Sequence, residues 1–155
     1  VKPNYFRIFI ADATGHGIQA AFLTMMIKSE YDTMNHQEFL PNEILKSFNN
    51  SYTTKYKDLV YFFSCFILDI DLKLNKGIYS AAGHPEQILL RNKNIIKLFA
   101  KGSIIGLKLE SEYFNQTIEI QNLDRFFLFT DGLFEEFNIE GEEFGELELY
   151  KQIQY

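Results

Sequence analysis

The stretch from Tyr5 to Ala21 reads YFRIFIADATGHGIQAA and joins two kinds of pattern. Its first seven residues, Tyr5 to Ala11, are mostly aromatic and β-branched and are followed by Asp12, which predicts a buried strand. A glycine-rich loop follows, and the next segment predicts a helix from Ile18 to Met34. Residues recur there at helical spacing, at Ile18, Ala21, Phe22, Met25, Met26 and Ser29.

The remainder of the chain predicts a second helix followed by hairpin strands. This helix begins near Pro41, where the missing N–H of proline is tolerated, and carries Ile44, Leu45 and Phe48 on one face. Six later segments have strand patterns and are separated by polar turns. They are Tyr61–Ile70, Ile78–Ala82, Gln87–Arg91, Ile95–Phe99, Tyr113–Ile120 and Phe126–Thr130. The last residues of the chain have a helical pattern. We therefore expect an α+β domain with a largely antiparallel sheet.

Composition limits the class of protein. The 155 residues, of which 46% are hydrophobic and 23% charged, suit one globular domain over residues 1–155. No apolar run approaches the ~18–20 residues of a membrane span. A single cysteine, Cys65, cannot form an internal disulfide and favours a reducing, cytoplasmic setting. The net charge of -6 and the lack of a basic stripe argue against nucleic acid as a partner.

Two aspartates are candidates for metal binding because each lies at the end of an apolar strand and is followed closely by a glycine. They are Asp12, in IADATG, and Asp131, in FTDG. Hard divalent cations such as Mg²⁺ and Mn²⁺ bind carboxylate oxygens, and a strand holds such a group rigidly. Asp-Gly is also a common turn pair, so a purely structural role is equally compatible with either aspartate.

Other polar residues have a structural interpretation beside the functional one. His16 could move a proton or bind a metal, or its ring could fix the loop by hydrogen bonding. For His84, before Pro85, a structural or supporting role is favoured. Asp69 and Asp71 resemble the start of a calcium loop, but no further acids follow at the required spacing, so a hairpin end fits better. The acids from Glu135 to Glu148 lack ligand spacing and predict a solvated face.

Three segments in one order carry a family resemblance. They are IADATGHGIQAA at residues 10–21, YSAAGHP at residues 79–85 and DRFFLFTDGLFE at residues 124–135. They closely resemble the stage II sporulation protein E-like branch of the PPM-type (protein phosphatase 2C-like) serine/threonine phosphatases. That branch shows D-x-[ST]-G-H-G-x-x-A-A, then A-G-H-P/N, then G-D-R-x-x-x-[YF]-T-D-G-x-x-E.

The resemblance implies a central antiparallel β-sandwich flanked by α-helices, with two Mn²⁺ or Mg²⁺ ions at one end. Carried over to this sequence, Asp12 would bridge the metals, Ala13 would offer its backbone carbonyl, and Asp131 would bind one ion. A metal-activated water would attack phosphorus, so no catalytic side chain is implied. The motifs also contain residues that would support the site: Gly15, His16, Gly17, His84 and Gly132.

The implied function is that of a metal-dependent phosphatase acting on phosphoserine or phosphothreonine in bacterial signalling, for example in an anti-sigma-factor antagonist pathway. The implied partners are a phosphorylated protein and an upstream sensory or regulatory domain. A homodimer and a membrane-tethered parent protein are both compatible with the resemblance. The alternative is a catalytically silent, phosphatase-like interaction module.

Two family motifs do not occur in this sequence. They are the early acidic motif G-D-x-[YF]-D and the late motif D-D-x-[ST], which complete the metal ligands. We therefore expect a domain that is incomplete at both ends and retains only part of the ligand set. Because two carboxylates rarely hold an ion in water, we expect this chain alone to bind metal weakly or not at all.

Overall fold

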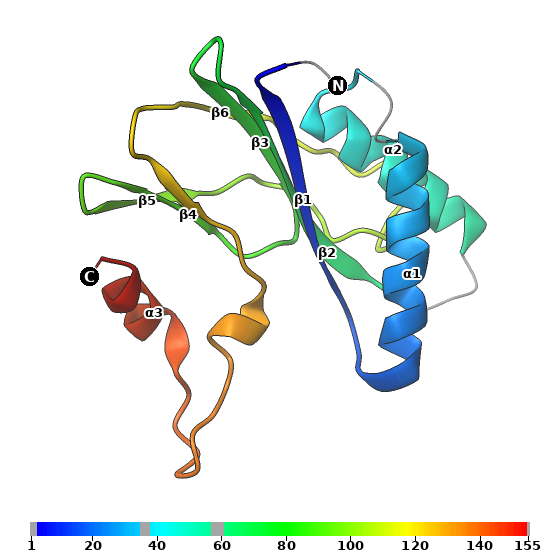
Figure 1. The fold of residues 1–155 in the computed structure, drawn as a ribbon. Coiled ribbons are helices and arrows are strands. Elements are labelled where there is room, and N and C mark those ends of the chain that lie inside the picture. Colours follow the sequence, from blue (N-terminus) through cyan, green and yellow to red (C-terminus); the bar gives the residue numbers. More distant parts are fainter. Residues whose placement is uncertain (1–2, 35–37, 57–60, 155) are drawn as a thin grey trace.

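The computed structural model describes residues 3–34, 38–56 and 61–154, which form two antiparallel sheets with helices on their outer faces (Figure 1). The helices are α1 (Gly17–Met34), α2 (Pro41–Lys55) and α3 (Gly145–Gln154), with a 3₁₀ turn at Asp131–Leu133. The strands are β1 (Tyr5–Ala13), β2 (Phe63–Asp71), β3 (Lys76–Ala82), β4 (Gln87–Arg91), β5 (Asn94–Leu98), β6 (Gln116–Glu119) and β7 (Arg125–Phe127). None of the described helices is both long enough and apolar enough to cross a membrane.

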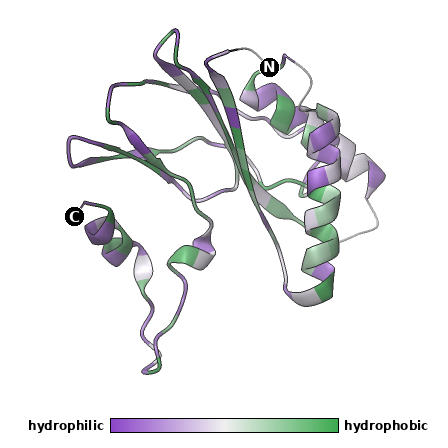
Figure 2. Ribbon diagram, in the orientation of Figure 1, coloured by the Kyte–Doolittle hydropathy of each residue, from purple (hydrophilic) through white to green (hydrophobic). Residues whose placement is uncertain are grey.

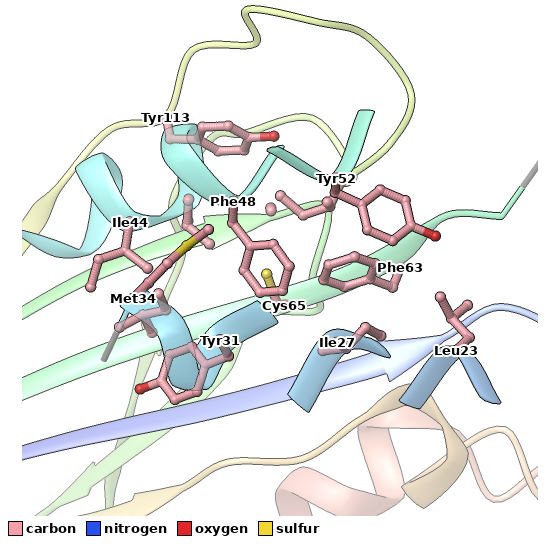
Figure 3. Packing of buried hydrophobic residues seen from close by; sticks show 14 residues of the cluster. Leu23, Ile27, Tyr31, Met34, Ile44, Phe48, Tyr52, Phe63, Cys65 and Tyr113 are labelled. Atoms are coloured by element: carbon pink, nitrogen blue, oxygen red, sulfur yellow. The ribbon is translucent and has the colours of Figure 1, made fainter. Parts of the chain in front are cut away.

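The first sheet has the order β1-β2-β3-β6, and α1 and α2 cover one of its faces. Side chains from both helices converge on β2, where Phe48 of α2 packs against Phe63 with ring centroids 5.1 Å apart (Figure 3). Cys65 lies in the same core and is fully buried. Burial raises the pKa of its thiol, so the lone cysteine behaves as a small hydrophobic residue.

The second sheet has the order β5-β4-β7 and lies against the other face of the first. Successive side chains of a strand point to opposite faces, so Leu89 packs between the sheets while Ile88 and Leu90 pack toward α3. Hydrophilic and hydrophobic residues alternate along α3 in Figure 2, and its Leu149 and Ile153 contact that outer face. The predicted α+β fold, an antiparallel β-sandwich flanked by helices, is confirmed.

Helix α1 forms where it was predicted but buries a different face. Ile18, Phe22 and Met25 are 76%, 63% and 67% exposed. The residues packed against the core are Leu23, Ile27, Tyr31 and Met34, and the ring of Tyr31 stacks on Phe9 at 4.1 Å. Apolar residues occur on several sides of this helix, so helical spacing predicted the helix without identifying its buried face.

Several strand ends differ from the predictions. Strand β1 continues through Ala13, which places Asp12 within the strand and opposite Ser64 of β2. Strand β6 is only four residues long, where Tyr113–Ile120 was predicted. Strand β7 ends at Phe127 rather than at Thr130, because the next part of the chain is hydrogen-bonded to the side chain of Gln87 instead of to a strand.

The aspartates at the end of β2 have structural partners, as predicted for a hairpin. Asp69 accepts hydrogen bonds from Arg7 Nε at 2.6 Å and from the Tyr5 hydroxyl at 2.6 Å. Asp71 accepts the N–H groups of Lys73 and Leu74 and so closes the turn before β3. Both carboxylates are therefore used by the fold at the end of the sheet.

Candidate metal centre

Asp12 and Asp131 line the same pocket, a cavity of about 670 Å³. The pocket is formed by the end of β1 and the loop after it, the start of β2, the turn between β3 and β4, the loop at Ile104, the 3₁₀ turn with the residues after it, and the start of α3. Its lining residues are Asp12, Ala13, Thr14, Gly15, Ser64, Gly83, His84, Pro85, Ile104, Asp131, Phe134, Glu135 and Glu146. The fold thus brings together two aspartates from distant parts of the sequence, Asp12 in β1 of the first sheet and Asp131 in the 3₁₀ turn that follows the second sheet.

The pocket is strongly acidic. It is lined by four carboxylates, and no lysine or arginine occurs among the described residues that line it. The pKa of Asp12 is raised to about 6, mainly by burial and then by a side-chain hydrogen bond with Asp131 and by the charge of Asp131. The N–H of Ala13 opposes this shift by bonding to the Asp12 carboxylate. Two carboxyl groups share a hydrogen bond only when one carries a proton, so this pair favours either a proton or a cation.

The donor set fits part of a divalent-cation site. Carboxylate oxygens, supplemented by a backbone carbonyl such as that of Ala13, are the ligands that Mg²⁺ and Mn²⁺ prefer. In residues 3–34, 38–56 and 61–154, however, no group of three or more His, Cys, Asp or Glu side chains could hold a metal ion. The four pocket carboxylates therefore do not converge on one ion, and the candidate ligands Asp12 and Asp131 leave further ligand positions to be filled.

The predicted supporting residues fall into two groups. Gly15 and His84 line the pocket, whereas His16, Gly17 and Gly132 are not among its lining residues. Gly15 and Gly17 have φ values of +94° and +70°, so the loop after β1 uses the left-handed region that favours glycine. Gly132 does not, and a Cβ there would meet only Thr130 Oγ1 at 3.8 Å.

His84 is held between the two sheets. Its Nδ1 lies 2.7 Å from Ser64 Oγ and its Nε2 lies 3.2 Å from the carbonyl oxygen of Phe129. A carbonyl only accepts, so Nε2 carries the proton and Nδ1 accepts from the serine hydroxyl. Burial lowers the pKa of His84 to about 4, although the bond to Phe129 and the charge of Asp131 act in the opposite direction. The ring is therefore neutral at pH 7.

Some residues at or beside the pocket were not identified from the sequence. Ser64 is a polar residue within an apolar strand, and this could have marked it as a site residue. Gln87 is the first residue of its strand, and nothing in the sequence distinguishes it. The acids from Glu135 to Glu148 were predicted to form a solvated face, and most of them are exposed. Glu135 and Glu146 nevertheless line the pocket, where the charge of Glu135 contributes to the raised pKa of Asp12.

Comparison with known proteins gives a family match over nearly the whole chain. The model of the family described as "Stage II sporulation protein E (SpoIIE)" matches residues 2–154. Phosphoserine phosphatase RsbU of Bacillus subtilis (strain 168) is 28% identical over 131 residues, which are 83% of this chain and 39% of that protein. Phosphoserine phosphatase RsbP of the same organism is 23% identical over 137 residues, 86% of this chain and 34% of that protein. The chain thus spans less than half the length of these relatives.

Solved structures show the same fold. The SiaA-PP2C domain of Pseudomonas aeruginosa superposes with a TM-score of 0.82 at 18% identity, covering 97% of this chain and 65% of that one. A structure of the PP2C phosphatase domain with a fragment of the regulatory domain of SpoIIE from Bacillus subtilis gives a TM-score of 0.77 at 16% identity, covering 97% and 44%.

Proposed function

The chain belongs to the stage II sporulation protein E family, and on that premise we propose that it is part of a PP2C-type phosphatase domain that hydrolyses phosphoserine or phosphothreonine in proteins. The observation that carries the proposal is the acidic pocket that Asp12 and Asp131 line together, where burial and the neighbouring Asp131 raise the pKa of Asp12. Two carboxylates in one pocket, with no lysine or arginine on the described pocket wall, are suited to a divalent cation.

The site residues have separate roles in this proposal. Asp12 and Asp131 would hold Mn²⁺ or Mg²⁺, with the backbone carbonyl of Ala13 as a further ligand. When bound, two such ions supply an activated water and neutralise charge on the phosphoryl oxygens. Binding a cation in place of the shared proton would leave both carboxylates ionised. Further acidic ligands are expected from parts of the protein beyond the residues described.

The pocket does not favour a side chain of this chain as the nucleophile. Ser64 and His84 resemble a serine–histidine pair, but the lowered pKa of His84 makes its ring a weak base. Cys65 is fully buried, and its pKa is raised by that burial, so little thiolate forms. The described residues are therefore better suited to holding and orienting a cation-activated water.

We further propose that the substrate is a phosphorylated protein in a bacterial signalling pathway, for example an anti-sigma-factor antagonist. The support is that two relatives are phosphoserine phosphatases. The proposal includes a cytoplasmic catalytic domain, a sensory or regulatory domain elsewhere in the same protein, and a homodimer. The neighbour that contains a fragment of a regulatory domain is compatible with this arrangement.

The proposal is tested by hydrolysis of a phosphoserine peptide by the intact protein, with and without MnCl₂. Replacing Asp131 by Asn removes the negative charge of one proposed metal ligand and should lower kcat/KM at least about 100-fold. Loss of a residue that only orients a metal ligand already lowers metal affinity or activity about 10- to 100-fold. Asp32→Asn is the matched control, since Asp32 is exposed on α1 and forms an ion pair with Lys28. Turnover without metal, or equal turnover by Asp131→Asn, would contradict the proposal.

A catalytically silent interaction module is the alternative, and one observation favours it. Among the described residues, no three His, Cys, Asp or Glu side chains are grouped so that they could hold a metal ion. The candidate ligands Asp12 and Asp131 therefore lack a third protein side chain. Such a module would bind the phosphorylated partner without releasing phosphate. Phosphate release from the peptide by the intact protein therefore separates the two functions.

A further inference from the structure

The backbone of Phe129, two residues before Asp131, is held by side chains rather than by a neighbouring strand. Its N–H donates to Gln87 Oε1 at 2.7 Å, and its carbonyl accepts from Gln87 Nε2 at 3.0 Å. The same carbonyl accepts from His84 Nε2 at 3.2 Å. Both polar groups of this peptide segment are therefore satisfied at the point where β7 has already ended.

His84 connects this segment to the strand that faces Asp12. Its Nδ1 accepts from the hydroxyl of Ser64, and Ser64 lies opposite Asp12 in the β1–β2 register. A continuous series of contacts therefore runs from Asp12 through Ser64, His84 and the Phe129 carbonyl to the segment carrying Asp131. This series crosses from the first sheet to the part of the chain that follows β7 of the second.

The two side chains that hold the Phe129 backbone, Gln87 and His84, are themselves rigidly placed. Gln87 is fully buried, and its amide also donates to the carbonyl of Pro85 at 3.0 Å. His84 follows Gly83, which has φ +63° and whose Cβ, if present, would lie 3.0 Å from Ile104 Cα. The Gly83 N–H bonds to the carbonyl of Gly102, which fixes the turn that presents the histidine.

We propose that His84 and Gln87 are positioning residues that set the separation of Asp12 and Asp131 and so determine the affinity of the pocket for a divalent cation. They do this by holding the Phe129 peptide against both sheets, without binding the cation or the substrate. This proposal rests on the proposed function, because it assigns a purpose to the spacing of the two aspartates. It also explains why the pocket contains a buried neutral histidine hydrogen-bonded at both ring nitrogens.

The test is Mn²⁺ binding to the intact protein, measured by titration calorimetry with MnCl₂. His84→Ala should weaken binding about 10- to 100-fold, as is typical when a group that orients a metal ligand is lost. Gln87→Met, which keeps the volume but removes the Phe129 contacts, should weaken it similarly. His84→Gln can retain a donor to the Phe129 carbonyl and should restore part of the affinity. In the activity assay, kcat at saturating MnCl₂ should change little in His84→Ala while the MnCl₂ concentration for half activation rises.

Ser80→Ala is the control for a merely structural effect. Ser80 is a buried strand residue whose hydroxyl donates to the carbonyl of Phe114 at 2.9 Å, and Ser80 is not among the described pocket-lining residues. We expect Ser80→Ala to lower stability without changing Mn²⁺ affinity. Ser64→Ala removes the hydrogen bond to His84 Nδ1 but keeps the histidine and the overall packing. It therefore tests the positioning role if His84→Ala does not fold.

The outcomes separate this proposal from the proposed function. Unchanged Mn²⁺ affinity in folded His84→Ala and Gln87→Met, or in Ser64→Ala where those do not fold, would overturn the positioning role even if the enzyme is active. Wild-type protein that binds Mn²⁺ but releases no phosphate would overturn the proposed function, and the affinity ratios would still decide the positioning role. Wild-type protein that binds no Mn²⁺ would overturn both.

Discussion

Asp12 in β1 and Asp131 after β7 line one pocket, where burial and then Asp131, through a side-chain hydrogen bond and its charge, raise the pKa of Asp12. This arrangement places two acidic groups where burial already disfavours charge. Without a bound cation, the pair is therefore a source of instability at neutral pH, and this has a measurable pH dependence.

The pair predicts that the metal-free protein loses stability as the pH rises. The folded-state pKa of Asp12 is about 6, above its ordinary value of 3.8, so the folded state binds more protons between these values and the free energy of unfolding falls across this window. Asp131→Asn should be more stable than wild type by about 1 kcal/mol at pH 7 after allowance for solvent screening, and no more stable near pH 4. Urea unfolding in EDTA at both pH values measures this. A stability gain that is larger at pH 4 would refute it.

The ion pair between Arg7 and Asp69 predicts a large stability loss when broken. Asp69 is buried and the Arg7 side chain is only 9% exposed, and Arg7 also donates to the carbonyl of Phe39 at 2.7 Å. Asp69→Ala leaves the guanidinium without its carboxylate and should lower the free energy of unfolding by about 3–5 kcal/mol. Asp32→Ala breaks the exposed pair with Lys28 and should change it by less than about 0.5 kcal/mol. Equal effects of the two variants in urea unfolding would refute this.

Two glycines predict opposite responses to alanine. A Cβ at Gly102 would lie 2.1 Å from the carbonyl oxygen of Ala81 and 2.7 Å from the ring of Tyr113, so the backbone would have to move. We expect Gly102→Ala to destabilise the protein by about 3 kcal/mol or more. Gly132→Ala meets only Thr130 Oγ1 at 3.8 Å and should be tolerated. Thermal unfolding of both variants measures the difference. A Gly102→Ala protein as stable as wild type would contradict the close approach of Gly102 to Ala81 and Tyr113.

The orientation of α1 predicts which of its residues stabilise the fold. Leu23 is 2% exposed and packs in the core with Phe63, whereas Phe22 next to it is exposed. Leu23→Ala should lower the free energy of unfolding by about 2–5 kcal/mol, because it leaves a cavity. Phe22→Ala should change it by less than about 0.5 kcal/mol. The reverse order in urea unfolding would mean that the helix buries the face suggested by its sequence spacing.

The elements were predictable from the sequence because their signals are local. Strand patterns around polar turns identified the hairpins, and helical spacing identified α1 and α2. The face of α1 was not predictable, since the choice depends on the fit of Tyr31 against Phe9 rather than on spacing. The early end of β7 was not predictable either, because it depends on a side chain, Gln87, that is remote in sequence.

The candidate site was predictable to the extent that its residues lie in recognisable motifs. Asp12, Asp131 and His84 were named from the sequence, and the structure places all three at one pocket. Their metal-binding and supporting roles stay predictions. The partner of His84, Ser64, was missed because the contact joins β2 to the turn after β3, and such a contact depends on the three-dimensional register of the strands.

The buried position of Cys65 allows its thiol to report when α1 and α2 separate from β2. The thiol lies beneath α1 and α2 (Figure 3), so an aromatic disulfide reagent cannot reach it until those helices separate from β2. The rate of thiol modification at low denaturant would therefore measure how often the helical layer detaches. Since the loop carrying Gly15 leads directly from Asp12 into α1, the same rate would report how firmly one wall of the acidic pocket is anchored.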